Sequence, residues 1–218
     1  MNVPHPIIKR FFLPCLLALM TIRACFGAEG QAGKVTVRAI LGKAQFSRVS
    51  GQFTPLGPGM TLRSGDLIQT ASDSALDLDF GEGIGTVRLT EDALLVLEKF
   101  SIADSKPAAN FELQLHLRKG ELLGLARHVP SESRFEVKVA NGIAQVIEGQ
   151  FRVDDRSYVV VVKGKILFAH VPPGGEPAAH TLTAPPAVYF SPAEGVRPAP
   201  KALEREVVKQ MRSKLPRR

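Results

Sequence analysis

Cysteine is almost absent from this sequence, since its 218 residues include only Cys15 and Cys25. Both lie in an N-terminal segment that we expect to be removed. The domain that follows would then contain no disulfide, no catalytic thiol and no thiolate ligand for a metal. Tryptophan is missing and aromatic residues make up only 6% of the chain, so a nucleic acid would find few rings on which to stack its bases.

Positive charge is also lacking in the central part of the sequence, although the whole chain carries a net charge of +7. Residues 1–28 contribute +3 of this charge and residues 201–218 contribute +5, which leaves −1 for the stretch between them. A domain that binds the phosphates of a nucleic acid needs Lys and Arg residues concentrated on its folded surface. We therefore expect no nucleic-acid partner.

The first residues are typical of an export signal. Two basic residues precede an apolar stretch over residues 11–22, and small residues follow it. This stretch is shorter than the roughly 20 residues of a membrane-spanning helix. We expect a signal peptide over residues 1–28, cleaved near Gly27 or Ala28, and export to the periplasm or cell envelope. An uncleaved anchor and a lipoprotein attached through Cys25 are the alternatives.

Alternation of apolar and polar residues dominates residues 29–191. It occurs in the segments KVTVRAI, ALDLDF, TVRLT, FELQLHL, FEVKV, QFRV and YVVVV. Each segment is bounded by Gly, Pro, Asn or Ser, and the spacing is about ten residues. The pattern predicts an all-β domain over residues 29–191, with no helix before residue 200.

Glycine marks the expected turns between these strands. Asn141-Gly142 is the strongest signal for a short hairpin, because this dipeptide adopts the backbone conformation that such turns need. The other turn candidates identified from the residues themselves are Gly65, Gly81, Gly83, Gly85 and Gly164.

The glycine cluster in LDLDFGEGIGTVRL, residues 76–89, has two interpretations. A phosphate-binding loop would be followed by a helix, whereas alternation resumes after Gly85. We interpret the cluster as a hairpin turn centred on Glu82 and Gly83. The expected register pairs Leu76 with Leu89, Asp77 with Arg88, and Leu78 with Val87. A longer loop that shifts this pairing by two residues is the alternative.

Residues suited to catalysis or metal binding are scattered. His116 is expected on a polar strand face, and His128 lies in the segment ARHVP without a partner at ligand spacing. His170 and His180 border the Pro-Gly-rich loop HVPPGGEPAAH, where we expect solvated histidines, and a metal site formed by these two residues across the loop is the alternative. The densest acidic group consists of Asp73, Asp77, Asp79 and Glu82. We interpret it as a solvated strand face with Arg88 as a cross-strand partner, and calcium binding or hydrolysis by paired carboxylates is the alternative. We therefore expect no enzymatic activity, no catalytic residue, no metal and no cofactor.

Two long stretches resemble the FecR domain family. They are PLGPGMTLRSGDLIQTASDSALDLDFGEGIGTVRLTEDALLVL and ESRFEVKVANGIAQVIEGQFRVDDRSYVVVVKGKILFA, and together they cover most of residues 33–171. The resemblance implies a twisted β-roll or short solenoid-like stack, while periodicity alone also permits an antiparallel β-sandwich. It also implies structural turns at Gly65-Asp66, where the carboxylate would accept backbone N–H bonds, and at Gly149.

The sequence departs from the family at the residues that flank Gly149. The family commonly has Arg and Thr there, whereas this chain has Glu148 and Gln150. FecR sensors also place a cytoplasmic domain and a membrane helix before this domain, and we expect neither here. We therefore expect a stand-alone exported module that binds a protein or polymer partner in the bacterial cell envelope, in sensing or scaffolding. An envelope hydrolase and a tethered structural subunit are the alternatives.

The C-terminal segment differs from the rest of the chain. A Pro/Ala linker is expected over residues 192–200, followed by a basic amphipathic helix over residues 201–218. Its apolar stripe consists of Leu203, Val207, Met211 and Leu215. We expect this helix to dock on the β domain or to fray in solvent, and contact with an anionic surface is the alternative. The basic residues available for that contact are Lys201, Arg205, Lys209, Arg212, Lys214, Arg217 and Arg218.

Overall fold

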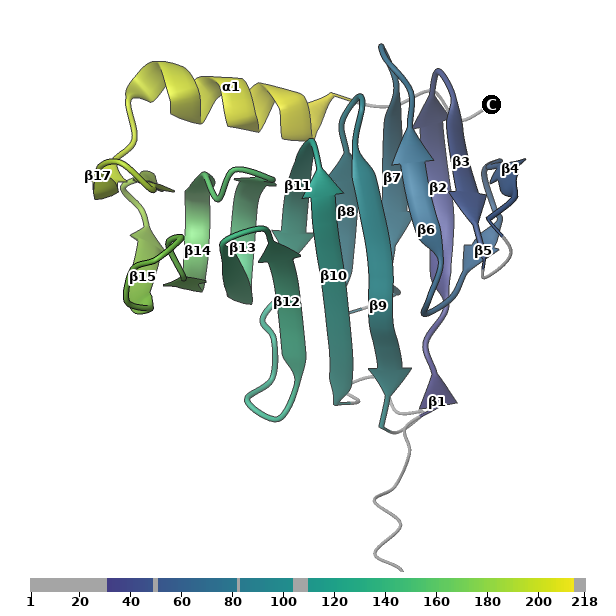
Figure 1. Cartoon of the computed structure of the whole chain (residues 1–218), viewed down its shortest axis with the longest axis horizontal. Coiled ribbons are helices and arrows are strands. Elements are labelled where there is room, and N and C mark those ends of the chain that lie inside the picture. The colour runs from purple at the N-terminus through teal and green to yellow at the C-terminus, as the bar shows by residue number, and fades with distance from the viewer. Residues whose placement is uncertain (1–30, 49–50, 82, 104–109, 214–218) are drawn as a thin grey trace, which may run out of the picture.

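The computed structural model describes residues 31–48, 51–81, 83–103 and 110–213, which form an all-β body with one C-terminal helix (Figure 1). The expected signal peptide lies outside these residues. In chain order the strands are β1 (Gln31–Ala32), β2 (Val35–Leu41), β3 (Ala44–Ser47), β4 (Phe53–Pro55), β5 (Thr61–Leu62), β6 (Leu67–Thr70), β7 (Ala75–Asp79), β8 (Gly85–Leu89), β9 (Leu94–Ile102), β10 (Phe111–Lys119), β11 (Glu121–Ala126), β12 (Arg134–Val139), β13 (Gly142–Asp154), β14 (Val159–His170), β15 (Ala178–Ala184), β16 (Val188–Ser191) and β17 (Gly195–Pro198). The helix is α1 (Lys201–Arg212).

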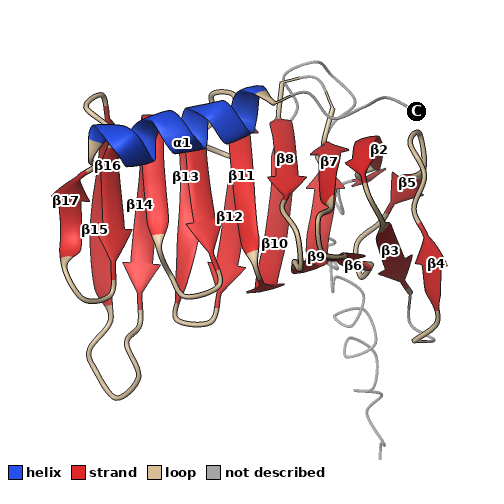
Figure 2. Cartoon of the chain, turned by 90° about the horizontal axis from the view of Figure 1, so that it is seen from above, coloured by secondary structure: helices blue, strands red, loops and turns tan. Residues whose placement is uncertain are grey.

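The strands form one sheet that curls back on itself, so that two layers face each other (Figures 1 and 2). The helix-side layer lies under α1 and runs β5, β2, β7, β8, β11, the hairpin β13–β14, β16 and β17. The far layer runs β4, β3, β6, β9, β10, β12, the same hairpin, and β15. The short β1 pairs with the end of β9.

The hairpin β13–β14 belongs to both layers. The first part of β13 pairs with β12 and its last part with β11, while β14 pairs first with β16 and then with β15. Gly149 and Gly164 face each other where the strands pass between the layers, and their φ angles are 118° and 92°. A Cβ on Gly149 would lie 1.8 Å from the carbonyl oxygen of Lys163, so only glycine fits there. This continuity makes the fold a roll and not a sandwich of two separate sheets.

One step of the chain has the geometry of a solenoid coil. Strand β10 lies in the far layer, β11 crosses to the helix-side layer, and β12 returns to the far layer beside β10. The pairing of β10 with β12 is therefore parallel. This coil, set among antiparallel hairpins, fits the roll or solenoid-like stack that the resemblance to the FecR domain family implies.

The core fills the space between the layers. Alternating residues of each strand point inward, as in β10, where the side chains of Leu113, Leu115 and Leu117 are fully buried. Phenylalanines meet across the gap, including Phe135 with Phe151, whose ring centroids lie 6.2 Å apart at an interplanar angle of 75°. An edge-to-face pair of this kind contributes about 1 kcal/mol beyond the area that it buries.

The structure corrects two sequence-based boundaries. Residues 195–198, expected within a linker, form β17, which pairs with β16 in register from Val188 to Ser191. The helix ends at Arg212, and the remainder of the expected helix, residues 214–218, lies outside the described residues. Within the described part of the chain, no helix is both long and apolar enough to cross a membrane.

Candidate interaction surfaces

The glycine cluster forms a hairpin turn between β7 and β8. The register pairs Leu76 with Leu89 and Asp77 with Arg88, as predicted. The amide of Ile84 donates to the carbonyl of Gly81 across the turn, at 3.4 Å. Strand β8 begins at Gly85, where a phosphate loop would require a helix.

The carboxylates of the acidic strand are already engaged. Asp77 accepts two hydrogen bonds from the Arg88 guanidinium, at 2.6 and 2.8 Å. Asp79 accepts the amide of Gly81 at 2.9 Å and so supports the turn. Among the described residues, no three His, Cys, Asp or Glu side chains are grouped so that they could hold a metal ion. Glu82 lies outside those residues.

Two of the histidines pack against a core phenylalanine instead of lying in a solvated loop. His170 belongs to β14 and is buried, and His180 on the neighbouring β15 is half-buried. Both rings contact Phe190, with centroid distances of 5.1 Å for His170 and 4.7 Å for His180. Burial lowers the pKa of His170, and the nearby His180 lowers it further. The prediction of solvent exposure is therefore wrong for His170.

The other two histidines lie on the surface. The Nδ1 atom of His116 lies 3.1 Å from Glu98, on the outer face of the far layer. Glu98 also accepts a hydrogen bond from Lys138 at 2.5 Å, and this bond is the main reason that the pKa of Glu98 is lowered. His128 is exposed, 3.4 Å from Glu148. These contacts form two separate polar groups on the surface.

The predicted turn residues fall into two groups. Gly65 lies in a turn, and the neighbouring Asp66 accepts the backbone amide of Arg63 at 2.9 Å. Asn141 also lies in a turn, and Gly142 follows it as the first residue of β13. Gly81 and Gly83 belong to the β7–β8 turn described above. Gly149 and Gly164, in contrast, lie inside strands, where they permit the passage between layers.

Helix α1 docks on the outer face of the helix-side layer (Figure 2). Val207 is fully buried against Leu123 of β11 and Val160 of β14, and Leu203 and Met211 pack beside it. These helical residues are spaced by four and belong to the predicted apolar stripe. The stripe is therefore covered by the protein's own sheet. Leu215 lies outside the described residues.

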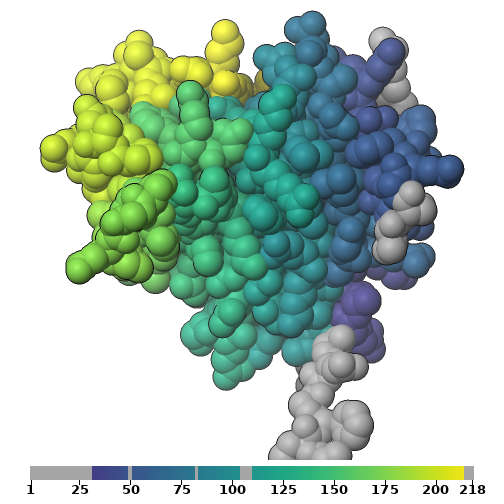
Figure 3. Space-filling view, in the orientation of Figure 1, coloured from purple at the N-terminus to yellow at the C-terminus, as the bar shows by residue number. Residues whose placement is uncertain are grey.

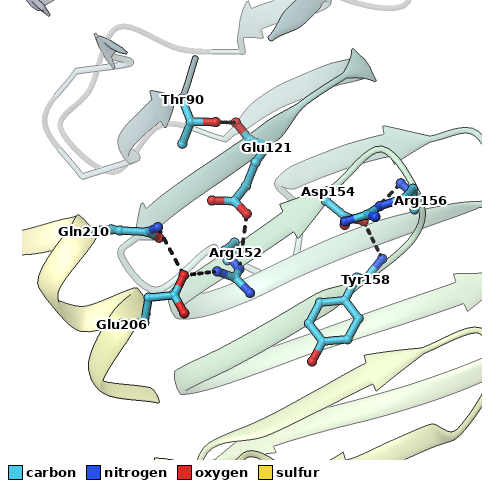
Figure 4. A network of polar contacts seen from close by, with 8 residues as sticks. All are labelled: Thr90, Glu121, Arg152, Asp154, Arg156, Tyr158, Glu206 and Gln210. Atoms are coloured by element: carbon cyan, nitrogen blue, oxygen red, sulfur yellow. Dashed lines mark hydrogen bonds and ion pairs between the residues drawn. The ribbon is translucent and has the colours of Figure 1, made fainter. Parts of the chain in front are cut away.

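Arg152 of β13 links the helix to the sheet through ion pairs (Figure 4). Its guanidinium lies 3.2 Å from Glu206 of α1 and 3.5 Å from Glu121 of β11, and its side chain is only 11% exposed. Gln210 donates to the same Glu206 carboxylate at 3.4 Å. Burial raises the pKa of Glu121, although Arg152 opposes this effect. The pair of Arg152 and Glu206 fixes the position of α1 along the sheet.

Arg88 holds the C-terminal end of the helix. Besides Asp77, its guanidinium donates to the carbonyl of Gln210 and to the hydroxyl of Ser213, each at 2.7 Å. A free helix end leaves such carbonyls without a partner, so Arg88 acts as a cap supplied by the sheet. The sequence suggested the pairing with Asp77 but gave no sign of the contact with α1, which is more than 120 residues away in the chain.

The outer face of α1 is basic. Its exposed residues include Lys201, Arg205, Lys209 and Arg212, which we call the basic ridge. Within the described part of the chain, none of these four side chains forms an ion pair. The other basic residues predicted for this surface, Lys214, Arg217 and Arg218, lie outside the described residues.

Strand β15 is the last strand of the far layer. It pairs with β14 on one side, and no described strand pairs with its other side. Ala178, Ala179, Thr181 and Thr183 are exposed. The residue pattern did not predict a strand here, because the Pro-Gly-rich stretch that precedes Ala178 suggested a loop.

A groove of about 550 Å³ runs beside the C-terminal end of α1. Arg38, Leu125 and Met211 contribute to its walls, and the ion pair of Asp77 and Arg88 lies within it. The charges of that pair already match each other, so we assign no ligand to this groove.

Comparison with known proteins identifies part of the chain. Residues 66–167 match the family model described as FecR protein. This segment begins at the buried Asp66 and ends in β14, so it includes the hairpin turn of β7–β8, the coil of β10–β12 and both glycines of the layer crossing. No curated protein and no solved structure matches the chain.

Proposed function

This chain contains a FecR-like domain, and we propose that it is an exported, non-enzymatic module of the bacterial cell envelope that binds a protein partner through the open edge of β15. The proposal for export comes from the N-terminal sequence. The observation that carries the proposal for binding is the unprotected edge of β15, because an open edge presents unpaired backbone N–H and C=O groups that another strand can use.

The edge of β15 differs from the other edges of the sheet. Strand β15 spans seven residues, AAHTLTA, without Lys, Arg, Asp, Glu, Gly or Pro. In contrast, β5 has two residues, β4 ends at Pro55, and β17 contains Arg197 and Pro198. Short length, charge and proline are the features by which proteins protect edges from pairing. Strand β15 has none of them.

An extended polypeptide is the ligand that suits such an edge. In an antiparallel ladder, alternate residues direct their backbone groups away from the paired strand, so about half of the residues of β15 offer hydrogen bonds outward. Thr181 and Thr183 point to the outer face beside them. A partner that adds a strand would gain affinity from the backbone and selectivity from these side chains. A sugar polymer could not reproduce this ladder, so we favour a protein partner, whether in sensing or in scaffolding.

Hydrolysis by the acidic strand is the less favoured function. Two carboxylates with different protonation states are needed to act as acid and base. Asp77 is held by both branches of the Arg88 guanidinium, and Asp79 supports a turn. Both side chains therefore have structural partners that a catalytic role would have to displace.

The test adds charge to the edge. We would immobilise the chain from Glu29 onward and compare the envelope proteins that it captures with those captured by the double variant T181K/T183K. Lysine on an edge opposes strand addition. The matched control Q114K/Q145K adds the same charge to interior strands of the far layer. We expect at least one protein to be retained by the parent chain and by the control, and to be lost by the edge variant. Capture that is equal for all three chains would contradict the proposal, as would recovery of a small molecule converted to product.

A further inference from the structure

The basic ridge lies on the side of α1 that faces away from the sheet. With 100° between successive residues, Lys201, Arg205, Lys209 and Arg212 fall within an arc of about 80°. This arc lies roughly opposite Val207, which is fully buried. The four residues extend over about 16 Å of helix. Docking of the apolar stripe therefore leaves these four side chains exposed on the side of α1 away from the sheet, and Arg212 also lines the groove beside the C-terminal end of the helix.

The acidic residues of α1 do not cancel these charges. Glu206 lies toward the sheet, where it pairs with Arg152 at 3.2 Å. Glu204 lies in the first turn, where its charge complements the positive end of the helix dipole. The ridge itself carries four positive charges and no negative one. Residues 213–218 add three more basic residues to the sequence directly after it.

We infer that this ridge binds an anionic lipid surface and thereby orients the β-roll on a membrane. The ligand must be anionic because the ridge is cationic and has no partner of its own among the described residues. Helix α1, which carries the ridge, lies on the outside of the molecule, along the top left in Figures 1 and 3. A flat array of lipid phosphates can contact all four side chains at the same time, so a membrane suits this shape.

The contact that we infer is electrostatic and does not require insertion. A helix that enters a bilayer places its apolar face among the acyl chains. Here Val207 and its neighbours are already buried against Leu123 and Val160. Only the charged side chains are available, so binding should depend on lipid charge and decrease with salt.

Binding to β15 and binding to the ridge involve different surfaces. The ridge covers the outside of the helix-side layer, whereas β15 ends the far layer and lies below α1 in Figure 1. The inference therefore stands whether or not β15 accepts a partner strand. If both occur, the roll would be held against a membrane with its strand edge still accessible.

The test measures co-sedimentation of the chain from Glu29 onward with vesicles. We would compare vesicles of phosphatidylcholine alone with vesicles that contain about 30% phosphatidylglycerol. The ridge variant is K201Q/R205Q/K209Q/R212Q. The matched control, K34Q/K43Q/K163Q/K165Q, removes the same charge from exposed lysines of the β body. Because the ridge side chains are exposed, circular dichroism should be unchanged in both variants.

Near an anionic membrane, each Lys or Arg strengthens binding by about fivefold, the equivalent of ~1 kcal/mol. We expect the parent chain to bind only the anionic vesicles, and the ridge variant to bind them several hundredfold more weakly. The control variant should lose much less. An increase in ionic strength from about 0.05 M to about 0.5 M should release the parent chain.

Three results would overturn the inference. The first is a parent chain that does not distinguish anionic from neutral vesicles. The second is an equal loss in the ridge variant and its control, which would mean that only the net charge matters. The third is ridge-dependent binding to a soluble polyanion such as polyphosphate without binding to vesicles, which would assign the ridge to a polymer.

Discussion

Replacing Val207 with alanine should weaken the docking of α1 on the sheet while the β-roll stays folded. Val207 is fully buried at the centre of the helix contact. The substitution removes the equivalent of two methylene groups, each worth about 0.8 kcal/mol, and leaves a small cavity, so we expect a loss of about 2 kcal/mol. This corresponds to a shift of roughly 30-fold toward the undocked helix. A free helix of 12 residues is marginal in water, so undocking should also unfold it.

Hydrogen exchange of the α1 amides measures this shift, because these amides exchange when the helix opens. The V207A variant should exchange roughly 30-fold faster within α1, while the amides of β13 should keep their protection. Val208 provides a matched control: V208A removes the same atoms from the neighbouring, half-buried position and should accelerate exchange less than about fivefold. Equal effects of the two substitutions would refute the role assigned to Val207. Loss of protection throughout β13 would refute the independence of the roll.

Three further predictions test other parts of the structure. G149A should destabilise the roll by more than about 3 kcal/mol in urea unfolding, because its Cβ would meet the Lys163 carbonyl, whereas G51A, with positive φ but open space, should cost about 1 kcal/mol. R88K should speed exchange at the last turn of α1 and leave the midpoint of urea unfolding nearly unchanged, because lysine keeps the charge but cannot cap the helix and bind Asp77 together. The lowered pKa of His170 means that the unfolded chain binds a proton more readily, so stability should be lower at about pH 5.5 than at about pH 7.5. H170F should flatten this difference, and an unchanged pH dependence would contradict the assignment.

Alternation in the sequence predicts the strands because one face of each strand is buried in a continuous core. The side chains of β10 illustrate this, since Leu113, Leu115 and Leu117 point inward and the residues between them do not. The same pattern predicts the register of β7 and β8, because a slip by one residue would bury Asp77 and expose Leu76. Local information was sufficient for β7 and β8, because both strands alternate clearly and are joined by a short turn.

The passage of β13 and β14 between the layers depends on contacts that alternation does not encode. Gly149 and Gly164 resemble turn residues because they permit unusual backbone angles, and they do have positive φ. Their function comes from the close approach of two backbones, which requires the pairing of both strands to be known. For the same reason β15 was missed, since His170 and His180 seemed to border a loop until the pairing of β14 with β15 placed both rings against Phe190.

Helix α1 is part of the folded body, and this limits how its basic ridge can be tested. The helix covers the apolar side chains of Leu123 and Val160, together with the partly buried rings of Tyr158 and Tyr189. Deletion of residues 201–218 would expose this patch, and an exposed apolar patch promotes association with membranes and with other proteins. A truncated chain could therefore remain bound to the envelope after losing every charge of the ridge. Neutralising the ridge while keeping Val207 docked separates the two effects, because it removes the electrostatic contact and leaves the apolar surface covered.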